Sequence, residues 1–194
     1  MRAISLTQPW ASLMAWDAKR YETRDWSTSM RGEIAIVASK GFPRECREIC
    51  HTQPFAAVLN AHGVQIVSTK PSGPTQLPLG HVLAVVELDE CIATAPEGSE
   101  KRLSRSPIET PAAHELAFGN YGPGRFALIT RGVRALPHPV PVERIERGVV
   151  KPGGALGFYE LSPACERAVR EQLQEIERSR SVDVQTGASD KGAP

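Results

Sequence analysis

Residues 19–26 of the chain read Lys-Arg-Tyr-Glu-Thr-Arg-Asp-Trp, a combination of side chains that could do chemistry. If the second part of this segment is extended, its side chains alternate between two faces, so Glu22, Arg24 and Trp26 lie on one face. Lys19, in the preceding turn, can swing to the same side. Such lysine and arginine donors can bind phosphate or a base edge, and a lysine beside a carboxylate can serve acid–base catalysis. The alternative is a solvated hairpin in which Glu22 and Arg24 form a surface ion pair.

Two tryptophans and a glutamine near the N-terminus are further candidate ligand-binding residues. Trp10 and Trp26 could stack on a base, an interaction that contributes about 1–3 kcal/mol per base. Trp10 also begins a predicted helix with Leu13 behind it, which favours a place in the core. Gln8 precedes this helix and could either read a base edge or cap the helix.

Two later segments supply candidate phosphate donors. The turn Tyr121-Gly-Pro-Gly-Arg125 presents Arg125, which would donate to a phosphate if the turn overhangs a cleft. The glycines of this turn could also serve turn geometry alone. Ser39 and Lys40 follow a predicted strand and could face the same cleft, or they could form a solvated strand end.

Motifs for metals and cofactors are weak in this sequence. Cys46, Cys50 and His51 could form a metal corner, but no second Cys/His pair has zinc-like spacing. We therefore predict reduced thiols, no metal and no disulfide framework. The sequence has neither a G-x-G-x-x-G nor a G-x-x-x-x-G-K-[ST] loop, so nucleotide binding by a phosphate loop has no support and no cofactor is expected.

The composition limits the classes of function. The 194 residues include 23 Lys+Arg and 22 Asp+Glu, a formal charge of +1, which argues against gripping long nucleic acid or an anionic membrane by bulk charge. Glycine and proline number 16 each, which is unlike a helical bundle. No apolar run is long enough to span a membrane, and the N-terminus lacks a signal-like core. We therefore predict a cytoplasmic protein without membrane contact.

The hydrophobic pattern predicts an α+β fold, a small β-barrel of about five to six strands decorated with short helices. One helix begins at Pro9, and a helical stretch after residue 40 breaks at Pro54. The expected strands and extended segments are residues 4–8, 33–38, 81–88, 124–129, 133–142 and 157–161.

The C-terminal part is predicted to be helical. Ser162 is placed to cap a helix with Pro163 in its first position. The resulting division is a domain at 1–161, a C-terminal helix at 162–180 and a disordered tail at 181–194. Residues 95–112 are polar and proline-interrupted, and we expect them to be mobile.

The spacing Lys19-x-x-Glu22-x-Arg24 resembles the G-x-K-x-x-E-x-R signature of the ASCH domain family, small β-barrels related to PUA domains. The first glycine of that signature is Asp17 here. The resemblance covers roughly residues 1–161 and implies a PUA-like barrel. Segments that also resemble bacterial members of the family are residues 5–13, 31–40, 118–126 and 154–157.

The resemblance implies a cleft beside the barrel that is lined by the signature residues and binds RNA or another nucleic acid. One branch of the family consists of amidohydrolases that deacetylate N4-acetylcytidine with a Lys, a Thr and a Glu. Lys19 matches that lysine, but Glu22 stands where the branch has its threonine. Thr23 is displaced by one position, which in a strand means the opposite face. Glu115 could supply a cleft carboxylate, or it could be an exposed helical glutamate.

We weigh three hypotheses of function. The first is a monomeric binding module that holds single-stranded RNA or a modified nucleoside, with Lys19, Arg24 and Arg125 on phosphate or carbonyl oxygens. In this module Glu22 orients the cations or accepts from a base amino group. The second is an amidohydrolase of N4-acetylcytidine-like nucleosides, with Lys19, Glu22 and Glu115 as catalytic residues. The third is a protein-interaction adaptor that docks through the C-terminal helix.

Overall fold

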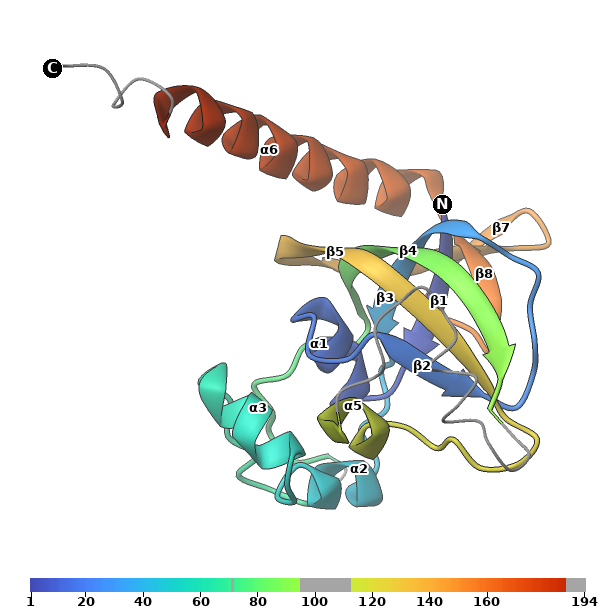
Figure 1. Cartoon of the computed structure of the whole chain (residues 1–194). Helices are drawn as coiled ribbons and strands as arrows, with labels where there is room; N and C mark the ends of the chain where they lie inside the picture. Colours follow the sequence, from blue (N-terminus) through green and yellow to red (C-terminus); the bar gives the residue numbers. More distant parts are fainter. Residues whose placement is uncertain (71, 95–112, 188–194) are drawn as a thin grey trace, which may run out of the picture.

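The computed structural model describes residues 1–70, 72–94 and 113–187, which contain eight strands and five helices (Figure 1). The segment 95–112, predicted to be mobile, lies outside the described residues. The strands are β1 (Arg2–Leu6), β2 (Tyr21–Arg24), β3 (Gly32–Ala38), β4 (His81–Ala93), β5 (Phe126–Pro141), β6 (Glu143–Glu146), β7 (Val149–Pro152) and β8 (Phe158–Leu161). The helices are α1 (Trp10–Ala15), α2 (Arg44–Ile49), α3 (Phe55–Ala61), α5 (Ala113–Ala117) and α6 (Pro163–Gly187).

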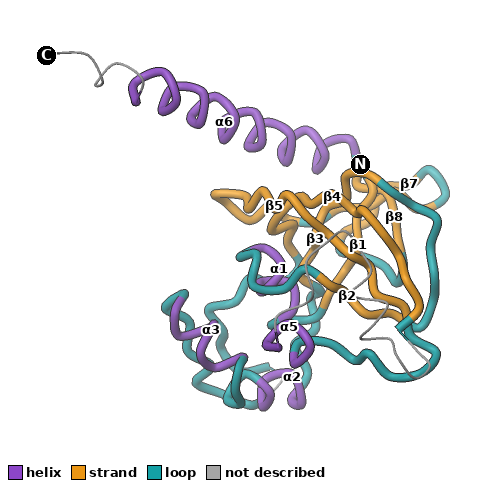
Figure 2. The backbone as a smooth tube through the Cα atoms, in the orientation of Figure 1, coloured by secondary structure: helices purple, strands orange, loops and turns teal. Residues whose placement is uncertain are grey.

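The described strands form one mixed sheet in the order β2-β5-β4-β3-β1-β8-β6-β7, which confirms the α+β class. β1 and β3 are parallel, and the other neighbouring strands pair antiparallel. Register shifts between the long strands β4 and β5 mark irregularities of the bulge type, which bend and twist strands. The sheet curls into a barrel-like shape (Figure 2).

The sheet has eight strands within the described residues, whereas the sequence predicted about five to six. The β6–β7 hairpin was missed, because it turns at Arg147 and Gly148, with φ of 51° and 77°. Positive φ at both central residues is typical of a type I′ turn, for which Asn-Gly and not Arg-Gly is the usual sequence. The segments predicted at 124–129 and 133–142 belong to one strand, β5.

Strand β3 is buried on both faces, which explains its uninterrupted apolar sequence. Ile34 and Ile36 pack in one core cluster with side chains of α1, whereas Ala35 and Val37 pack in another with side chains of α6. Side chains alternate along a strand, so each helix covers one face (Figure 1). The sheet therefore fixes α1 in place, and with α1 the chain that leads into β2.

The turn between α1 and β2 has Asp17 at the position where the signature that the sequence resembles has glycine. This residue has φ of 58°, the left-handed conformation that glycine adopts freely and that aspartate tolerates better than most residues. The Asp17 carboxylate accepts two hydrogen bonds of 2.8 Å from the Arg20 guanidinium. The substitution therefore keeps the turn that delivers Lys19 to the sheet.

Helix α6 begins as predicted, with the Ser162 hydroxyl accepting a hydrogen bond of 3.1 Å from the backbone N–H of Cys165. Its apolar face, which carries Val169 and Leu173, is buried against the sheet. A partner that docks through this part of the helix would therefore have to use its polar faces. None of the helices in the described ranges is both long and apolar enough to cross a membrane.

Helix α6 extends to Gly187, whereas the sequence predicted a helix to residue 180 and a disordered tail at 181–194. The tail was predicted from a lack of large apolar side chains. Once a helix is nucleated, however, each further residue adds a backbone hydrogen bond without an apolar contact. Residues 188–194 lie outside the described residues.

Candidate ligand-binding site

A cavity of about 550 Å³ lies at the end of β1, within the range of about 300–1,000 Å³ that is usual for small-molecule sites. α1, β2 and the segment after β3 contribute to its wall, although they are separate in the sequence. Five of the residues predicted to bind a ligand line this larger cavity: Trp10, Glu22, Arg24, Ser39 and Lys40.

Strand β2 has the alternation that the sequence predicts. Glu22 and Arg24 line the larger cavity, whereas Tyr21 and Thr23 are only 3% and 9% exposed. Trp26 lies beyond the end of β2 and packs edge-to-face on Phe158, with ring centroids 5.5 Å apart. Trp26 is not in the wall of this cavity, so its predicted role in stacking on a base has no geometric support.

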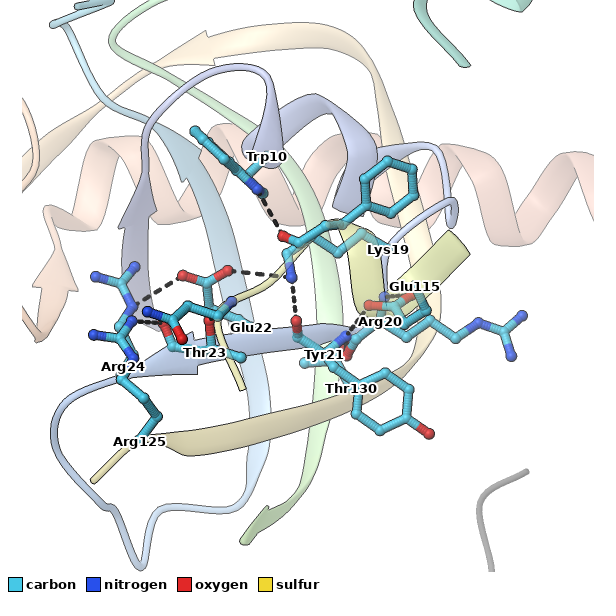
Figure 3. Close-up of polar contacts among 12 residues, drawn as sticks. Trp10, Lys19, Arg20, Tyr21, Glu22, Thr23, Arg24, Glu115, Arg125 and Thr130 are labelled. Carbon is cyan, nitrogen blue, oxygen red and sulfur yellow. Dashed lines mark hydrogen bonds and ion pairs between the residues drawn. The ribbon is translucent and has the colours of Figure 1, made fainter. Parts of the chain in front are cut away.

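The three signature side chains form a continuous row of charges (Figure 3). The Lys19 Nζ lies 3.7 Å from Glu22 Oε2, and the Arg24 Nε lies 3.0 Å from Glu22 Oε1. Lys19 is 0% exposed and also donates a hydrogen bond to the carbonyl of Tyr21. Arg24 donates from Nη2 to the carbonyl of Ser5 at 2.7 Å. Glu22 is therefore held between two cations, one buried beneath the cavity and one in its wall.

A second, smaller cavity of about 320 Å³ shares two wall residues, Trp10 and Glu22, with the larger one. Arg125 lines the smaller cavity and donates from Nη2 to the carbonyl of Thr23 at 3.0 Å. Within the described part of the chain, no carboxylate forms an ion pair with Arg125. The smaller cavity therefore contains a guanidinium whose charge is not balanced by a direct partner.

Trp10 packs against the core, as one of its two predicted roles requires, and it also lines both cavities. Its indole N–H donates a hydrogen bond of 2.7 Å to the carbonyl of Phe118, and its ring meets Phe55 edge-to-face at 5.7 Å. The ring also lines both cavities. The hydrogen bond fixes the plane of the indole, as stacking on a flat ligand requires.

Glu115 is 5% exposed, so the alternative of an exposed helical glutamate is wrong. Its carboxylate accepts hydrogen bonds from the backbone N–H groups of Arg20 and Tyr21 at 2.9 and 3.0 Å (Figure 3). Glu115 is in the wall of neither cavity. Its carboxylate holds the start of β2, and this geometry does not support a catalytic role.

Gln8 and Tyr121 also lie outside both cavity walls. Gln8 is 0% exposed; its Oε1 accepts from the backbone N–H of Ser12 at 3.2 Å, and its Nε2 donates to the carbonyl of Pro78 at 2.9 Å. Gln8 therefore takes the second of its two predicted roles, bonding to the first turn of the helix. Its side-chain oxygen and nitrogen are both hydrogen-bonded within the protein. Burial raises the pKa of the Tyr121 phenol, and the Glu115 and Glu22 carboxylates raise it further. Tyr121 therefore stays neutral.

The sequence analysis missed the wall contributed by residues 152–156, which come from the end of β7 and the connection to β8. Gly154 lies so close to the cavity floor that a Cβ atom there would be 2.0 Å from Ser5 Oγ and 2.6 Å from the Tyr159 hydroxyl oxygen. These two hydroxyl groups are hydrogen-bonded at 2.8 Å, and burial raises the pKa of Tyr159 to about 12. The signal that could have indicated this wall is the Gly153-Gly154 pair.

The cysteines do not form a metal site with their neighbours. Within residues 1–70, 72–94 and 113–187, no group of three or more His, Cys, Asp or Glu could hold a metal ion. Cys46 lines the larger cavity, and burial raises the pKa of its thiol. Burial likewise raises the pKa of Cys50 to about 12. Both cysteines are free thiols, and neither is an activated nucleophile.

The two cavities together combine hydrogen-bond donors, aromatic walls and a single described carboxylate. Arg24, Lys40 and Arg125 carry positive charge at their walls, against Glu22 alone. Aromatic rings from Trp10, Phe55 and Phe118 form one side of the smaller cavity. This arrangement suits a ligand that has a flat ring and an anionic or carbonyl-rich part.

Comparison with known proteins finds two relatives of part of the chain. A stretch of 92 residues, 46% of this chain, is 35% identical to activating signal cointegrator 1 of Homo sapiens. A stretch of 90 residues is 32% identical to the protein of the same name in Mus musculus. The match spans only 14% of the length of each relative. No family model matches the chain.

Proposed function

We propose that this chain is an ASCH-type domain that binds single-stranded RNA, or a nucleoside derived from it, in the larger cavity. The observation that carries the proposal is the meeting of Glu22 and Arg24, two residues of the signature spacing, with Trp10 and Lys40 in one cavity of about 550 Å³. The partial similarity to activating signal cointegrator 1 agrees with an ASCH-type assignment.

Each wall residue has a role that follows from its chemistry. Lys40 is exposed at the rim and would contact a phosphate, while Arg24 would donate to a phosphate or a base carbonyl from deeper in the wall. The fixed indole of Trp10 would stack on the base. Glu22, held between Lys19 and Arg24, would accept a hydrogen bond from a base amino group.

A fluorescence titration with a short labelled single-stranded RNA tests the proposal. A charge-assisted hydrogen bond contributes about 1.5–3 kcal/mol, so Lys40→Gln should weaken binding about tenfold or more. Lys70→Gln, which removes one charge from an exposed lysine in neither cavity wall, is the matched control and should bind as the unchanged protein does. Absence of binding at low salt, or equal affinity of both variants, would contradict the proposal.

A second candidate function is amidohydrolysis of an N4-acetylcytidine-like nucleoside. One observation favours it: Glu22 lines both cavities, and the fully buried Lys19 lies 3.7 Å behind its carboxylate. Such a pair could move a proton during attack on an amide. Incubation with N4-acetylcytidine followed by chromatography decides this question. Turnover that Glu22→Gln abolishes would support hydrolysis, and no deacetylated product from the unchanged protein would contradict it.

A further inference from the structure

We infer that the two cavities are consecutive subsites for two adjoining nucleotides of one strand, with the linking phosphate held by Arg24 and Arg125. This inference rests on the proposed function and deepens it. It assigns a binding role to the smaller cavity and a minimum length of two nucleotides to the preferred ligand.

The shared wall residues connect the two cavities. Trp10 and Glu22 line both, so a strand that fills one cavity can continue into the other past these two side chains. Arg24 lines the larger cavity and Arg125 the smaller one. Arg125 donates from Nη2 to the carbonyl of Thr23, the residue before Arg24, and Figure 3 draws this contact. A group bound between the cavities therefore has a guanidinium from each side.

The hydrogen bonding of these two arginines leaves room for an anion. The Nε of Arg125 is buried and has no hydrogen-bond partner within the described part of the chain, whereas the Nε of Arg24 faces Glu22 Oε1 at 3.0 Å. Each arginine uses Nη2 for a backbone carbonyl, of Ser5 and Thr23 respectively. Buried donors without an acceptor are unfavourable, and a phosphate oxygen is a strong acceptor for guanidinium N–H groups. Glu22 supplies the one carboxylate among the described wall residues, against Arg24, Lys40 and Arg125, which also favours an added negative charge.

The smaller cavity has the chemistry of a base subsite. Trp10, Phe55 and Phe118 supply aromatic surface, and the carboxylate of Glu22 and the amide of Asn120 supply polar atoms. A carboxylate accepts from the exocyclic amino group of cytosine or adenine and finds no such donor on uracil. The subsite should therefore favour a base that carries an amino group.

Calorimetric titrations with cytidine monophosphate and with the dinucleotides CpC and UpU test this inference. Stacking one further base contributes about 1–3 kcal/mol, so CpC should bind at least about fivefold more tightly than the mononucleotide. CpC should also bind more tightly than UpU. Arg125→Gln keeps an amide donor for the Thr23 carbonyl but removes the charge that would hold the linking phosphate, so it should weaken CpC binding about tenfold or more. Arg131→Gln, on the same strand and 64% exposed, is the matched control and should change neither affinity.

The outcomes separate this inference from the proposed function. If the mononucleotide binds and Lys40→Gln weakens it, but CpC binds no more tightly, the proposed function stands and the two-subsite inference is overturned. CpC affinity that Arg125→Gln leaves unchanged would also overturn it. UpU binding as tightly as CpC would overturn the assignment of an amino-bearing base. If none of the three nucleotides binds, both the proposed function and the inference are overturned.

Discussion

A fully buried lysine requires compensation, and Lys19 receives it from two sides. The Glu22 carboxylate lies 3.7 Å away, and the carbonyl of Tyr21 accepts a hydrogen bond from the ammonium group. Removing one partner of a buried pair leaves an uncompensated charge, which is more harmful than the pair is beneficial. At the scale of single residues, Glu22 therefore stabilises Lys19, and the proposed function gives its carboxylate a second role in contacting the ligand.

We expect Glu22→Gln to lower the free energy of unfolding by about 1–3 kcal/mol, because Lys19 then lacks its counter-charge. Urea denaturation measures the change. Glu48→Gln is the matched control: its side chain is 49% exposed and pairs with Arg44 on the surface. The control should lose no more than about 0.5 kcal/mol. Equal losses in the two variants would show that Lys19 does not depend on Glu22.

Glu115→Gln separates a positioning role from a catalytic one. The Glu115 carboxylate accepts two backbone N–H groups, and a glutamine offers only one oxygen, so one buried donor loses its partner. We expect a loss of about 1–3 kcal/mol in unfolding free energy. Ligand affinity, measured by titration of the folded variant, should be unchanged. A loss of turnover on N4-acetylcytidine without loss of stability would instead restore the predicted catalytic role.

At the scale of elements, the site depends on loops that approach one another closely. The connection between β7 and β8 passes over the end of β1, and only a residue without a side chain fits at Gly154. Ser5 and Tyr159 lie directly beneath it and are hydrogen-bonded to each other. The larger cavity therefore owes its floor to β1 and the stretch 152–159, which are distant in the sequence.

Gly154→Ala should damage this floor. The added Cβ would lie 2.0 Å from Ser5 Oγ, so the loop has to move, which we expect to cost about 1–3 kcal/mol of stability and to weaken ligand binding. Gly41→Ala is the matched control, since nothing lies within 4 Å of a Cβ there. Thermal unfolding and ligand titration measure both effects. Unchanged affinity in Gly154→Ala would mean that this loop does not shape the site.

The contact between α6 and the sheet should depend on pH. The hydrogen bond from Arg134 lowers the pKa of Glu33, and Arg170 of α6 lies 3.5 Å from the same carboxylate. A lowered pKa contributes stability above the unfolded value of about 4.3, and this contribution disappears as the pH falls through the folded pKa.

We therefore expect Glu33→Gln to lower the melting temperature at neutral pH and to have little effect under strongly acidic conditions. Glu171→Gln, an exposed change on α6, should have little effect at either pH. Melting curves over a pH series measure the difference. If Glu33→Gln lowers the melting temperature by the same amount at neutral and at strongly acidic pH, this role of the ion pair is contradicted.

The sequence predicted those features that depend on local patterns. The alternation of side chains along β2 predicted that Glu22 and Arg24 share one face. The apolar run at residues 33–38 predicted a buried strand. Glu115 could not be placed, because its partners Arg20 and Tyr21 are more than 90 residues away and only packing brings them together. Gly154 was missed for the same reason: its role is a close contact with Ser5, at the other end of the chain.

At the scale of the whole molecule, the near-balance of 23 basic and 22 acidic residues limits how nucleic acid can bind. Few cations line the cavities, so few counterions are released on binding. For a single strand, the slope of log affinity against log salt is about −0.7 for each phosphate contact, so a slope of about −1 to −2 is expected. Titrations over a salt series measure it. A slope several times steeper would indicate a broad basic surface instead of the two cavities.

The central claim, that RNA enters the cavities beside Trp10, is tested most directly by following the tryptophan indole N–H resonances in a two-dimensional NMR titration with a short single-stranded RNA. The chain has three tryptophans. Trp10 lines both cavities, whereas Trp26 packs on Phe158 outside their walls. We predict that the Trp10 resonance shifts on addition of RNA and that the Trp26 resonance does not. A shift of Trp26 without one of Trp10, or no shift of either at low salt, would contradict the account.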